Sequence, residues 1–508
     1  MKQIYEFDLS NVEPMERTFD IYQGRTIVSQ KLQQISKIDS EVTVIIMGYN
    51  RIKKTKRCVE SVLKYTSDVD YDLILVDNGS SDGTFEYFKT VEHNKLRIIR
   101  LNKNMGAALP SCLLDLNWFA NYMVAVPNDL IVTENWLSNL LAVAKSDPKI
   151  GMVNPVCSNT SNLQCVNFEF SDYDDMQEKA RRMNVSDPKK WEERIRLITL
   201  GALFKKDCMY ALGWPNADIG FAHDFGDDDI TFRVRRMGYK AILAGDTWIH
   251  HDHNIRAGED KDPVEFRNSI ICGKQNFRDK YFGVDAWDDV NNYIFPYLKG
   301  KLLPPTDPEN VKVLGVDVKC GTPILDIKNM IREFSVFEAE THAFFKDSKY
   351  DIDLRTICNG SVICDRIDYL YNSFAPNYFD YIVLGECLNN YAEPGKLIQD
   401  AFALLKEGGQ IYFPYKNTFD IYTLLKCVGH EISVSETPMH CKVEDFCEII
   451  GSGVGSDVEL ISAQFHETDD SINQFLNSVL DVSMPQNANR DSTLTNLNID
   501  KYWLRIVK

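Results

Sequence analysis

The segment YDLILVDNGSSDGT (residues 71–84) decides the fold of the first part of this chain. Its apolar, β-branched first half predicts a buried strand, and the Asp, Gly and Ser residues from Asp77 onward predict a loop. A similar run, VTVIIMGYN (42–50), also predicts a buried strand that ends in a loop. Between the two, RIKKTKRCVESVLKYT (51–66) places its apolar residues on one face of an amphipathic helix.

Two more strands are predicted in LRIIRLNKNMGAA (96–108) and NYMVAVPNDLIV (121–132). Strands that alternate with helices at this spacing indicate an α/β fold with a mostly parallel sheet. Ligands of such sheets bind beyond the carboxyl ends of the strands. Polar residues follow all four predicted strands, namely Asn50, Asp77, Asn104 and Asp129. We therefore expect a binding site at this edge of the sheet.

The composition is that of a globular protein and disfavours several kinds of partner. The 508 residues are 44% hydrophobic and 26% charged, so two or three domains with their own cores are expected. A net charge of −18 disfavours nucleic acid and anionic membranes. No stretch approaches the length of an apolar transmembrane helix, and the first residues do not resemble a secretion signal. Thirteen cysteines form no C-x-x-C pair, which favours reduced thiols in a cytoplasmic protein.

A Pro-rich, charged stretch separates two α/β patterns and predicts an interdomain linker at 296–310. Residues 1–40 are weakly periodic and predict no more than an arm or a short helix. The first domain is then expected over 41–295 and the second over 311–508.

The second domain also alternates strands and helices. Strands are predicted within 311–318, 331–340, 379–391, 410–415 and 501–508, and an amphipathic helix closed by glycines over 394–409. The segment FDYIVLGECLNNYAEPGKLIQDAFALLKEGGQIYFPYKN (379–417) resembles the later half of a class I methyltransferase. This resemblance implies a Rossmann-like fold and S-adenosylmethionine as the cofactor of an active member.

The loop that would hold the methyl donor departs from that family's pattern. The family has a G-x-G-type turn after its first strand, but VLGVDVKCGTP (313–323) has Gly315 and Gly321 followed by Pro323. Glu338 is the acid expected to hold a ribose. We expect a degenerate fold that binds the acceptor or forms a homo-oligomer, with S-adenosylmethionine binding as the alternative.

Several carboxylates and imidazoles in the first domain are candidate ligands of a metal ion. Asp129 follows an apolar run, where a buried carboxylate is costly unless a cation or a donor meets it. The segment FAHDFGDDDITFRVRRMGYK (221–240) is rich in acids, which an exposed acidic loop would also explain. The segment WIHHDHN (248–254) holds three of the nine histidines. Together with Asp129, these histidines fit a hard divalent cation that also binds a ligand's phosphates.

These segments occur in the order and spacing of family-2 glycosyltransferases with the GT-A fold, which residues 41–285 resemble. The segments are VTVIIMGYNR, LILVDNGSSDGT, IRLNKNMGAA, the PND turn, FGDDDITFRVRRMGY and IHHDH. The resemblance implies a nucleotide-sugar donor, commonly a UDP-sugar such as UDP-GlcNAc, across the strand ends. It also implies Mn²⁺ or Mg²⁺ on the donor diphosphate. The expected architecture is thus a GT-A nucleotide-sugar-binding domain followed by a second Rossmann-like α/β domain.

The resemblance also assigns residues to the donor. The implied donor-binding positions are Gly48, Tyr49, Asn50, Arg51, Asp77, Asn104, Gly106 and Asn128. Among them, Asp77 is the acid that reads the base, and Gly106 lets the backbone approach the donor closely.

The implied metal ligands are one acid and one late histidine. Asp129 matches the last acid of the family's D-x-D motif, and Pro127 stands where its first Asp is expected. Either His251 or His250 matches the late metal-binding histidine, and the spacing favours His251.

The implied catalytic base lies in the acidic segment. Aligned on Arg233, the family's E-D-x-D-L-x-x-R motif places Asp227 at the base, with Gly226 in place of the preceding Glu. A shift of one residue would move this role to Asp228. A carboxylate base is needed because an acceptor hydroxyl is a poor nucleophile near neutral pH.

The acceptor side of the site is expected in GALFKKDCMYALGWPN (201–216). Gly201 begins this segment, and Trp214 is either a platform for the acceptor or a core residue. The expected reaction is inverting sugar transfer to a hydroxyl of a glycan or a protein Ser/Thr. The alternatives are a bifunctional glycosyltransferase and methyltransferase, or a non-catalytic nucleotide-sugar-binding scaffold.

Overall fold

The computed structural model divides the chain into two units, Met1–Asn291 and Asn292–Lys508. The residues that the structure describes are 2–11, 39–105, 116–213, 225–253, 263–428, 441–466, 470–483 and 489–508.

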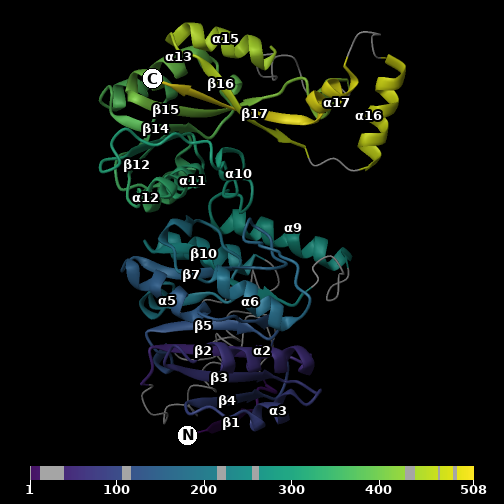
Figure 1. The fold of residues 1–508 in the computed structure, drawn as a ribbon. Helices are drawn as coiled ribbons and strands as arrows, with labels where there is room; N and C mark the ends of the chain where they lie inside the picture. Colours follow the sequence, from purple (N-terminus) through teal and green to yellow (C-terminus); the bar gives the residue numbers. More distant parts are fainter. Residues whose placement is uncertain are drawn as a thin grey trace. The chain divides into compact units, whose positions relative to one another are not determined.

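The first unit is built on one mixed sheet. Its strands are β1 (Gln3–Phe7), β2 (Val42–Gly48), β3 (Tyr71–Asn78), β4 (Leu96–Leu101), β5 (Tyr122–Pro127), β6 (Leu130–Ile131), β7 (Ile150–Cys157), β8 (Trp191–Arg194), β9 (Leu203–Lys205) and β10 (Lys240–His251). They are ordered β1-β4-β3-β2-β5-β9-β7-β10-β6, with β8 paired to β10. Figure 1 shows β1, β4, β3, β2, β5, β7 and β10 in this order. Strands β1 to β5 run parallel, whereas β9 is antiparallel to both its neighbours. The four strands predicted from residues 42–132 all form.

Helices cover the sheet on both faces. They are α2 (Ile52–Tyr65), α3 (Thr84–Thr90), α5 (Trp136–Ser146), α6 (Tyr173–Met183), α7 (Lys206–Ala211), α8 (Gly226–Arg236) and α9 (Pro263–Lys280). Within β2, Ile45 belongs to one apolar cluster, and Val44 and Ile46 belong to the other. Burial on both faces explains why β2 reads as a continuous apolar run rather than an alternating one.

The strand register brings the predicted binding loops together. Gly48 of β2 pairs with Asp77 of β3, and Asp77 pairs with Arg100 of β4. On the other side of β2, Met47 pairs with Pro127 of β5. The loops after these parallel strands therefore leave the sheet at one edge.

The second unit contains a Rossmann-like sheet. Its strands are β11 (Lys312–Val316), β12 (Glu340–Phe345), β13 (Val362–Cys364), β14 (Phe379–Leu384), β15 (Leu405–Lys416), β16 (Val458–Phe465) and β17 (Ile499–Val507). They are ordered β13-β12-β11-β14-β15-β17-β16. Numbered within the unit, this order is 3-2-1-4-5-7-6, the doubly wound order with an antiparallel strand inserted before the edge strand. The expected second Rossmann-like domain is thus confirmed.

Except for α10, which precedes β11, the helices of this unit lie between its strands in sequence. They are α10 (Phe295–Leu298), α11 (Thr322–Met330), α12 (Asp351–Ile357), α13 (Pro394–Leu404), α14 (Ile421–Val428), α15 (Val443–Val454), α16 (Asp470–Ser483) and α17 (Arg490–Asn498).

Several sequence predictions are wrong in detail. The strand predicted at 331–340 is a 3-10 turn over Ile331–Phe334, and the strand itself begins only at Glu340. The apolar residues there close the helix end, since the Val336 N–H donates to the Ile331 carbonyl. Glu338 therefore lies at the amino end of β12, opposite to the edge where a ribose would bind. The predicted arm also contains β1, which pairs with β4.

Two further findings concern thiols and membranes. All cysteines whose side chains the structure describes are free thiols, and Cys364 is exposed at the end of edge strand β13. None of the described helices is long and apolar enough to cross a bilayer.

Candidate active site

The loop after β2 holds the first donor-binding candidates. Asn50 and Arg51 have φ values of 53° and 60°, in the left-handed region that Asn tolerates better than most residues. The Asn50 N–H donates to Ser80 Oγ (3.0 Å), and Asn50 Oδ1 accepts from the Ser81 N–H (3.0 Å). These bonds tie the loop after β2 to the loop after β3. Tyr49 between the strand and this turn is exposed.

Gly48 lies where a side chain would be crowded. A Cβ atom there would lie 3.3 Å from both Phe88 and Thr84 of α3. Gly79, which the sequence analysis did not single out, is tighter still: with φ of 80°, its Cβ would lie 2.4 Å from the Lys103 backbone. Glycine at this position lets the loops after β3 and β4 meet.

Asp77 is a fully buried acid at the end of β3. Its Oδ1 accepts from the Ser80 N–H (3.0 Å), and Arg100 Nε lies 3.9 Å from Oδ2. Burial raises the pKa of this carboxyl, partly offset by the bonds from Ser80. Among the described residues, no hydrogen bond reaches Asp77 Oδ2. This buried acceptor suits a ligand N–H or hydroxyl group.

Two other donor-binding candidates have different surroundings. Asn128 Nδ2 donates to Thr55 Oγ1 (2.9 Å) and to the Asn50 carbonyl (3.3 Å), so it braces the loop after β2. Asn104 is exposed, and its Oδ1 accepts from Asn78 Nδ2 (2.9 Å). Gly106 lies outside the described residues.

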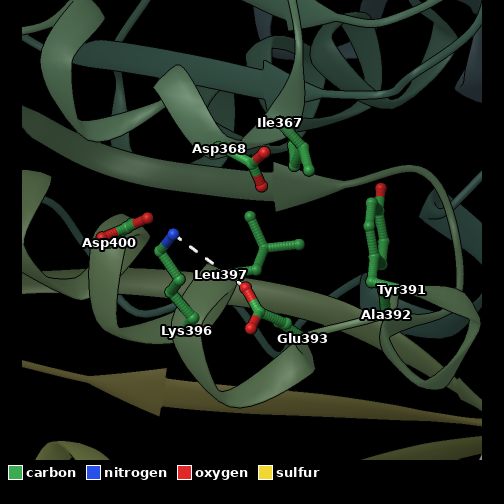
Figure 2. Close-up of a pocket in the computed structure, with 8 residues that line it drawn as sticks. All are labelled: Ile367, Asp368, Tyr391, Ala392, Glu393, Lys396, Leu397 and Asp400. Atoms are coloured by element: carbon green, nitrogen blue, oxygen red, sulfur yellow. Dashed lines mark ion pairs between the residues drawn. The ribbon is translucent and has the colours of Figure 1, made fainter.

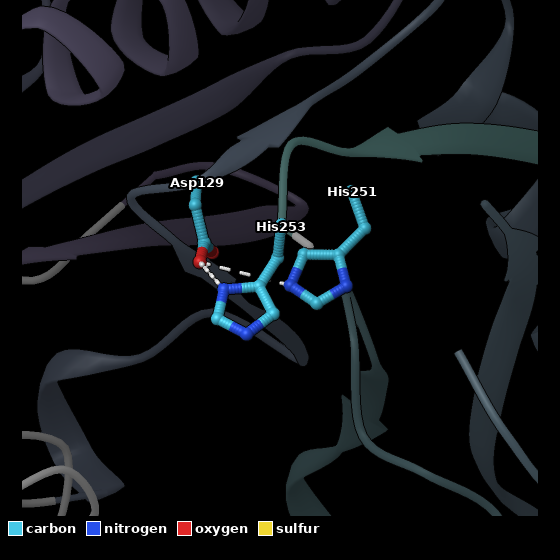
Figure 3. Close-up of side chains that lie close together, drawn as sticks. All are labelled: Asp129, His251 and His253. Carbon is cyan, nitrogen blue, oxygen red and sulfur yellow. Dashed lines mark ion pairs between the residues drawn. The ribbon is translucent and has the colours of Figure 1, made fainter. Parts of the chain in front are cut away.

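Asp129, His251 and His253 converge on one point (Figure 3). His251 Nε2 lies 3.6 Å and His253 Nδ1 lies 3.9 Å from Asp129 Oδ2. The two imidazole rings are stacked, with centroids 5.3 Å apart and planes 10° from parallel. A carboxylate and two imidazoles are ligands that suit a divalent metal ion. These three side chains therefore fit the divalent metal ion that the sequence resemblance implies.

Strand pairing creates this cluster. His251 of β10 lies opposite Leu130 of β6, and the Asp252 N–H donates to the Asp129 carbonyl (2.8 Å). Side chains alternate along an extended chain, so His251 and His253 lie on one side and His250 on the other. His250 Nδ1 indeed lies 2.8 Å from Ser158 Oγ. The structure thus brings His253, rather than His250, together with Asp129.

The electrostatics of the cluster suit metal binding. Burial acts to raise the pKa of Asp129, but the nearby imidazoles of His251 and His253 hold that pKa below its ordinary value. Burial lowers the pKa of His253, which favours the neutral ring that binds metals.

Basic side chains of the β2–α2 region border the cluster. Arg51 Nη1 lies 3.9 Å from Asp129 Oδ2. Lys54 Nζ donates to the Asp252 carbonyl (2.5 Å), and Arg57 pairs with the Asp252 carboxylate (2.7 Å). A cation site bordered by basic groups suits a ligand that carries phosphates.

The three consecutive acids of α8 have different partners. Asp228 forms a buried ion pair with Arg196. Asp229 pairs with Arg233 (2.9 Å) and Lys280 (2.7 Å), and it accepts a hydrogen bond from Tyr281 (2.6 Å).

Asp227, in contrast, forms no ion pair with any described residue. Its Oδ1 accepts a hydrogen bond from Thr199 Oγ1. Burial, with the neighbouring Asp228 charge, raises the pKa of Asp227 despite the Thr199 bond. Unpaired carboxylates of raised pKa are typical of general bases.

The acceptor-side candidates are described only in part. Gly201 has φ of 67°, and a Cβ there would lie 2.8 Å from Ile249 Cδ1, so glycine permits close packing on β10. Trp214 lies outside the described residues.

Residues 43–188 match the family model described as glycosyl transferase family 2. They form a family-2 glycosyltransferase domain. The matched span contains Asp77 and Asp129, whereas α8 and the β10 histidines follow it. This confirms the resemblance found in the sequence.

Individual proteins that resemble parts of this chain are distant relatives. An uncharacterized protein y4gI of Sinorhizobium fredii is 23% identical over 266 residues, which cover 49% of this chain but only 28% of that protein. A mannosyltransferase of Pyrobaculum calidifontis, solved with GDP-Man and Mn²⁺, is 18% identical, with 50% of this chain and 78% of that chain covered and a TM-score of 0.31. A SAM-dependent methyltransferase of Archaeoglobus fulgidus is 14% identical, with 49% and 100% covered and a TM-score of 0.27.

The turn after β11 does not fit S-adenosylmethionine. Asp317 and Lys319 adopt left-handed φ values of 48° and 53° while carrying side chains. Gly321 packs on α12 instead, since a Cβ there would lie 2.7 Å from Ile357. Asp317 Oδ2 accepts from the Tyr391 hydroxyl (2.8 Å). A turn filled in this way does not let the backbone approach a methyl donor.

A pocket of the second unit is lined in part by Tyr391, the residue that donates to Asp317 of this turn (Figure 2). Its lining residues are Ile367, Asp368, Tyr391, Ala392, Glu393, Lys396, Leu397 and Asp400. Three acids face one lysine across apolar walls, and Lys396 lies 4.0 Å from Glu393. This lining gives the pocket no glycine-rich backbone for a nucleotide phosphate or a methionine carboxylate.

Proposed function

We propose that the first unit is a metal-dependent, inverting glycosyltransferase that moves a sugar from a nucleotide-sugar to a hydroxyl group. The observation that carries this proposal is the convergence of Asp129, His251 and His253 at the strand ends of the family-2 domain. A UDP-sugar such as UDP-GlcNAc is the expected donor. The expected acceptor is a glycan or a protein Ser/Thr, and the cytoplasmic location stays a prediction from the sequence.

The proposed donor lies along the loops after β2, β3 and β5. The buried Asp77 Oδ2 has acceptor capacity for an N–H of the base or a hydroxyl of the ribose. Arg51 lies where it can bind the diphosphate, beside the three proposed metal ligands. A bound divalent ion supplies Lewis-acid stabilisation of the charge that develops on the leaving diphosphate.

Asp227 is the proposed general base. Its carboxylate takes the proton from the acceptor hydroxyl as that oxygen attacks the anomeric carbon. Attack opposite to the leaving diphosphate inverts the configuration of this carbon. The hydrogen bond from Thr199 orients Oδ1 of Asp227. Asp228 and Asp229 form ion pairs with arginines, so their proposed role is structural.

A screen of UDP- and GDP-sugars for metal-dependent hydrolysis tests the proposal. We expect slow release of the nucleoside diphosphate from one donor class in the presence of Mn²⁺, and loss of release after chelation. Asp129→Ala should lower this release at least about 100-fold, because the variant loses an anionic metal ligand. Asp68→Ala, which removes an exposed acid of the same unit, is the matched control.

The outcome also separates the alternatives. Donor binding without any release, with or without acceptors, would favour a non-catalytic nucleotide-sugar-binding scaffold. Full release by Asp129→Ala would contradict the proposed metal ligand. For the second unit, we propose acceptor binding or homo-oligomer formation, since the turn after β11 does not suit a bifunctional enzyme with a methyl donor.

A further inference from the structure

We infer that Asp228 is a positioning residue, which holds Arg196 at a place where this cation does not pair with the proposed base, Asp227. The inference rests on the proposed function and deepens it, because it concerns the acid that takes the proton. It gives Asp228 a task beyond that of a structural ion pair. The groups involved belong to the first turn of α8 and to segment 196–199, which follows β8.

Segment 196–199 is fixed in place through its backbone. Asn162 Nδ2, from the loop after β7, donates to the Arg196 carbonyl (2.9 Å). From α8, Thr231 Oγ1 donates to the Leu197 carbonyl (3.1 Å). The backbone that carries Arg196 is therefore attached both to the loop after β7 and to the helix that carries the proposed base.

This segment meets two neighbouring acids of α8 with two different groups. Arg196 Nε donates to Asp228 Oδ1 in an ion pair. Three residues further on, Thr199 Oγ1 donates to Asp227 Oδ1. The third acid, Asp229, pairs with cations of its own. Asp227 thus receives a neutral donor while its neighbour receives the cation, although both donors come from the same short segment.

Burial gives this choice of partner a consequence. Arg196 and Asp228 are only 8% and 6% exposed. A guanidinium with so little contact to water needs a carboxylate beside it. Asp227 is the adjacent acid, and the charge of Arg196 already acts on it. Loss of the Asp228 charge therefore leaves the proposed base beside an uncompensated cation.

The neighbouring groups act on the pKa of Asp227 in opposite directions. Burial raises this pKa and the charge of Asp228, on the same helix, adds to the rise. The hydrogen bond from Thr199 and the charge of Arg196, both on segment 196–199, lower it. An amide at position 228 removes a contribution that raises the pKa and leaves one that lowers it. The expected result is a lower pKa of Asp227 and hence a weaker base.

The test is the pH dependence of kcat for Asp228→Asn in the full-length protein. The probe is the UDP- or GDP-sugar that the wild type hydrolyses fastest, with donor and Mn²⁺ both saturating. We expect the acidic limb of the kcat profile to move to lower pH by about one unit or more, the shift that a nearby opposite charge causes. At neutral pH, kcat should fall about two- to fivefold, because a weaker base takes the proton less readily. The Kd of the donor by calorimetry should stay unchanged.

Three control variants show whether the shift comes from the cation. Asp228→Glu keeps a carboxylate for Arg196 and should keep the wild-type profile. Asp228→Asn combined with Arg196→Met removes both charges, so its limb should lie between those of Asp228→Asn and the wild type. Glu193→Gln breaks another buried pair of α8, that of Glu193 with Arg235 (2.6 Å). Arg235 lies eight residues after Asp227, about 12 Å along the helix, so this variant should melt earlier without a shift of the limb.

The outcomes separate the inference from the proposed function. If Asp228→Asn melts below the assay temperature, Asp228→Ser replaces it at a lower temperature. An unmoved or raised limb in a folded variant that lacks the Asp228 charge would overturn the inference, as would an equal shift in Glu193→Gln. Donor hydrolysis by the wild type would still support the proposed function in both cases. Absence of hydrolysis by the wild type at every pH would contradict the proposed function itself.

Discussion

At the scale of single residues, α8 shows how neighbouring acids acquire different tasks. Asp228 and Asp229 are buried and neutralised by Arg196, Arg233 and Lys280. Asp227 forms no ion pair among the described residues, and Thr199 donates a hydrogen bond to it. An acid without a cation keeps its basicity, which is the property that proton abstraction needs.

Asp227→Asn should lower sugar transfer by roughly 100-fold or more while leaving donor binding unchanged, because an amide does not take the proton. Initial rates and calorimetry with the donor measure the two effects. Burial raises the pKa of Asp227, and the base acts when ionised, above that pKa. The kcat/KM of the wild type should therefore decline with acid at a higher pH than for an ordinary Asp of pKa about 3.9. Near-normal turnover of the variant would refute this role.

At the scale of secondary-structure elements, buried charges join adjacent strands. Asp72 of β3 forms an ion pair with Arg97 of β4, and both side chains are buried. Thr43 of β2 donates to the same Asp72 carboxylate (2.8 Å), and Arg97 donates to the Trp118 carbonyl (3.2 Å). The pair thus fixes three strands and the segment before β5.

Asp72→Ala should lower the free energy of unfolding by about 3–5 kcal/mol, because it leaves the Arg97 charge buried without its partner. Urea denaturation followed by tryptophan fluorescence measures the change. The double variant Asp72→Ala with Arg97→Met should recover part of the loss, since no charge then stays buried. A loss below about 1 kcal/mol in the single variant would show that the pair contributes little.

At the scale of the whole molecule, two α/β units make different use of the same kind of sheet edge. In the first unit, the strand ends present a buried acceptor that no hydrogen bond reaches among the described residues, a cluster of one carboxylate and two imidazoles, and basic side chains. In the second unit, the edge at β11 is filled by its own side chains, with the Tyr391 hydroxyl on Asp317.

S-adenosylmethionine should therefore leave the melting temperature of the full-length protein unchanged at millimolar concentration. A ligand at 100 times its Kd would stabilise the folded state by about 2.7 kcal/mol, which a thermal shift detects readily. Mn²⁺ with the preferred nucleoside diphosphate serves as the positive control. A clear shift with S-adenosylmethionine alone would restore the bifunctional alternative.

The sequence by itself determined most of the elements and the sheet edge at which the proposed site lies. Apolar runs such as 42–48 and 71–78 are buried on both faces of a sheet, and this burial leaves a local pattern that can be read directly. Polar residues after those runs, Asp77 and Asp129 among them, are brought to one edge by the parallel arrangement. Where the local pattern was ambiguous, as at 331–340, the prediction was wrong because helix ends and strands bury similar residues.

Only the tertiary structure decided which charged groups meet. Asp129 and His253 are distant in sequence, and they meet because β10 pairs with β6. Arg196 pairs with Asp228 rather than with Asp227, and this pairing cannot be predicted from the local sequence pattern. The physical reason is that burial of apolar side chains repeats with the period of each element, whereas an ion pair or a metal site depends on non-local pairing. The sequence shows that His250 and His253 lie on opposite sides of an extended chain. It does not show that Asp129 lies on the side of His253.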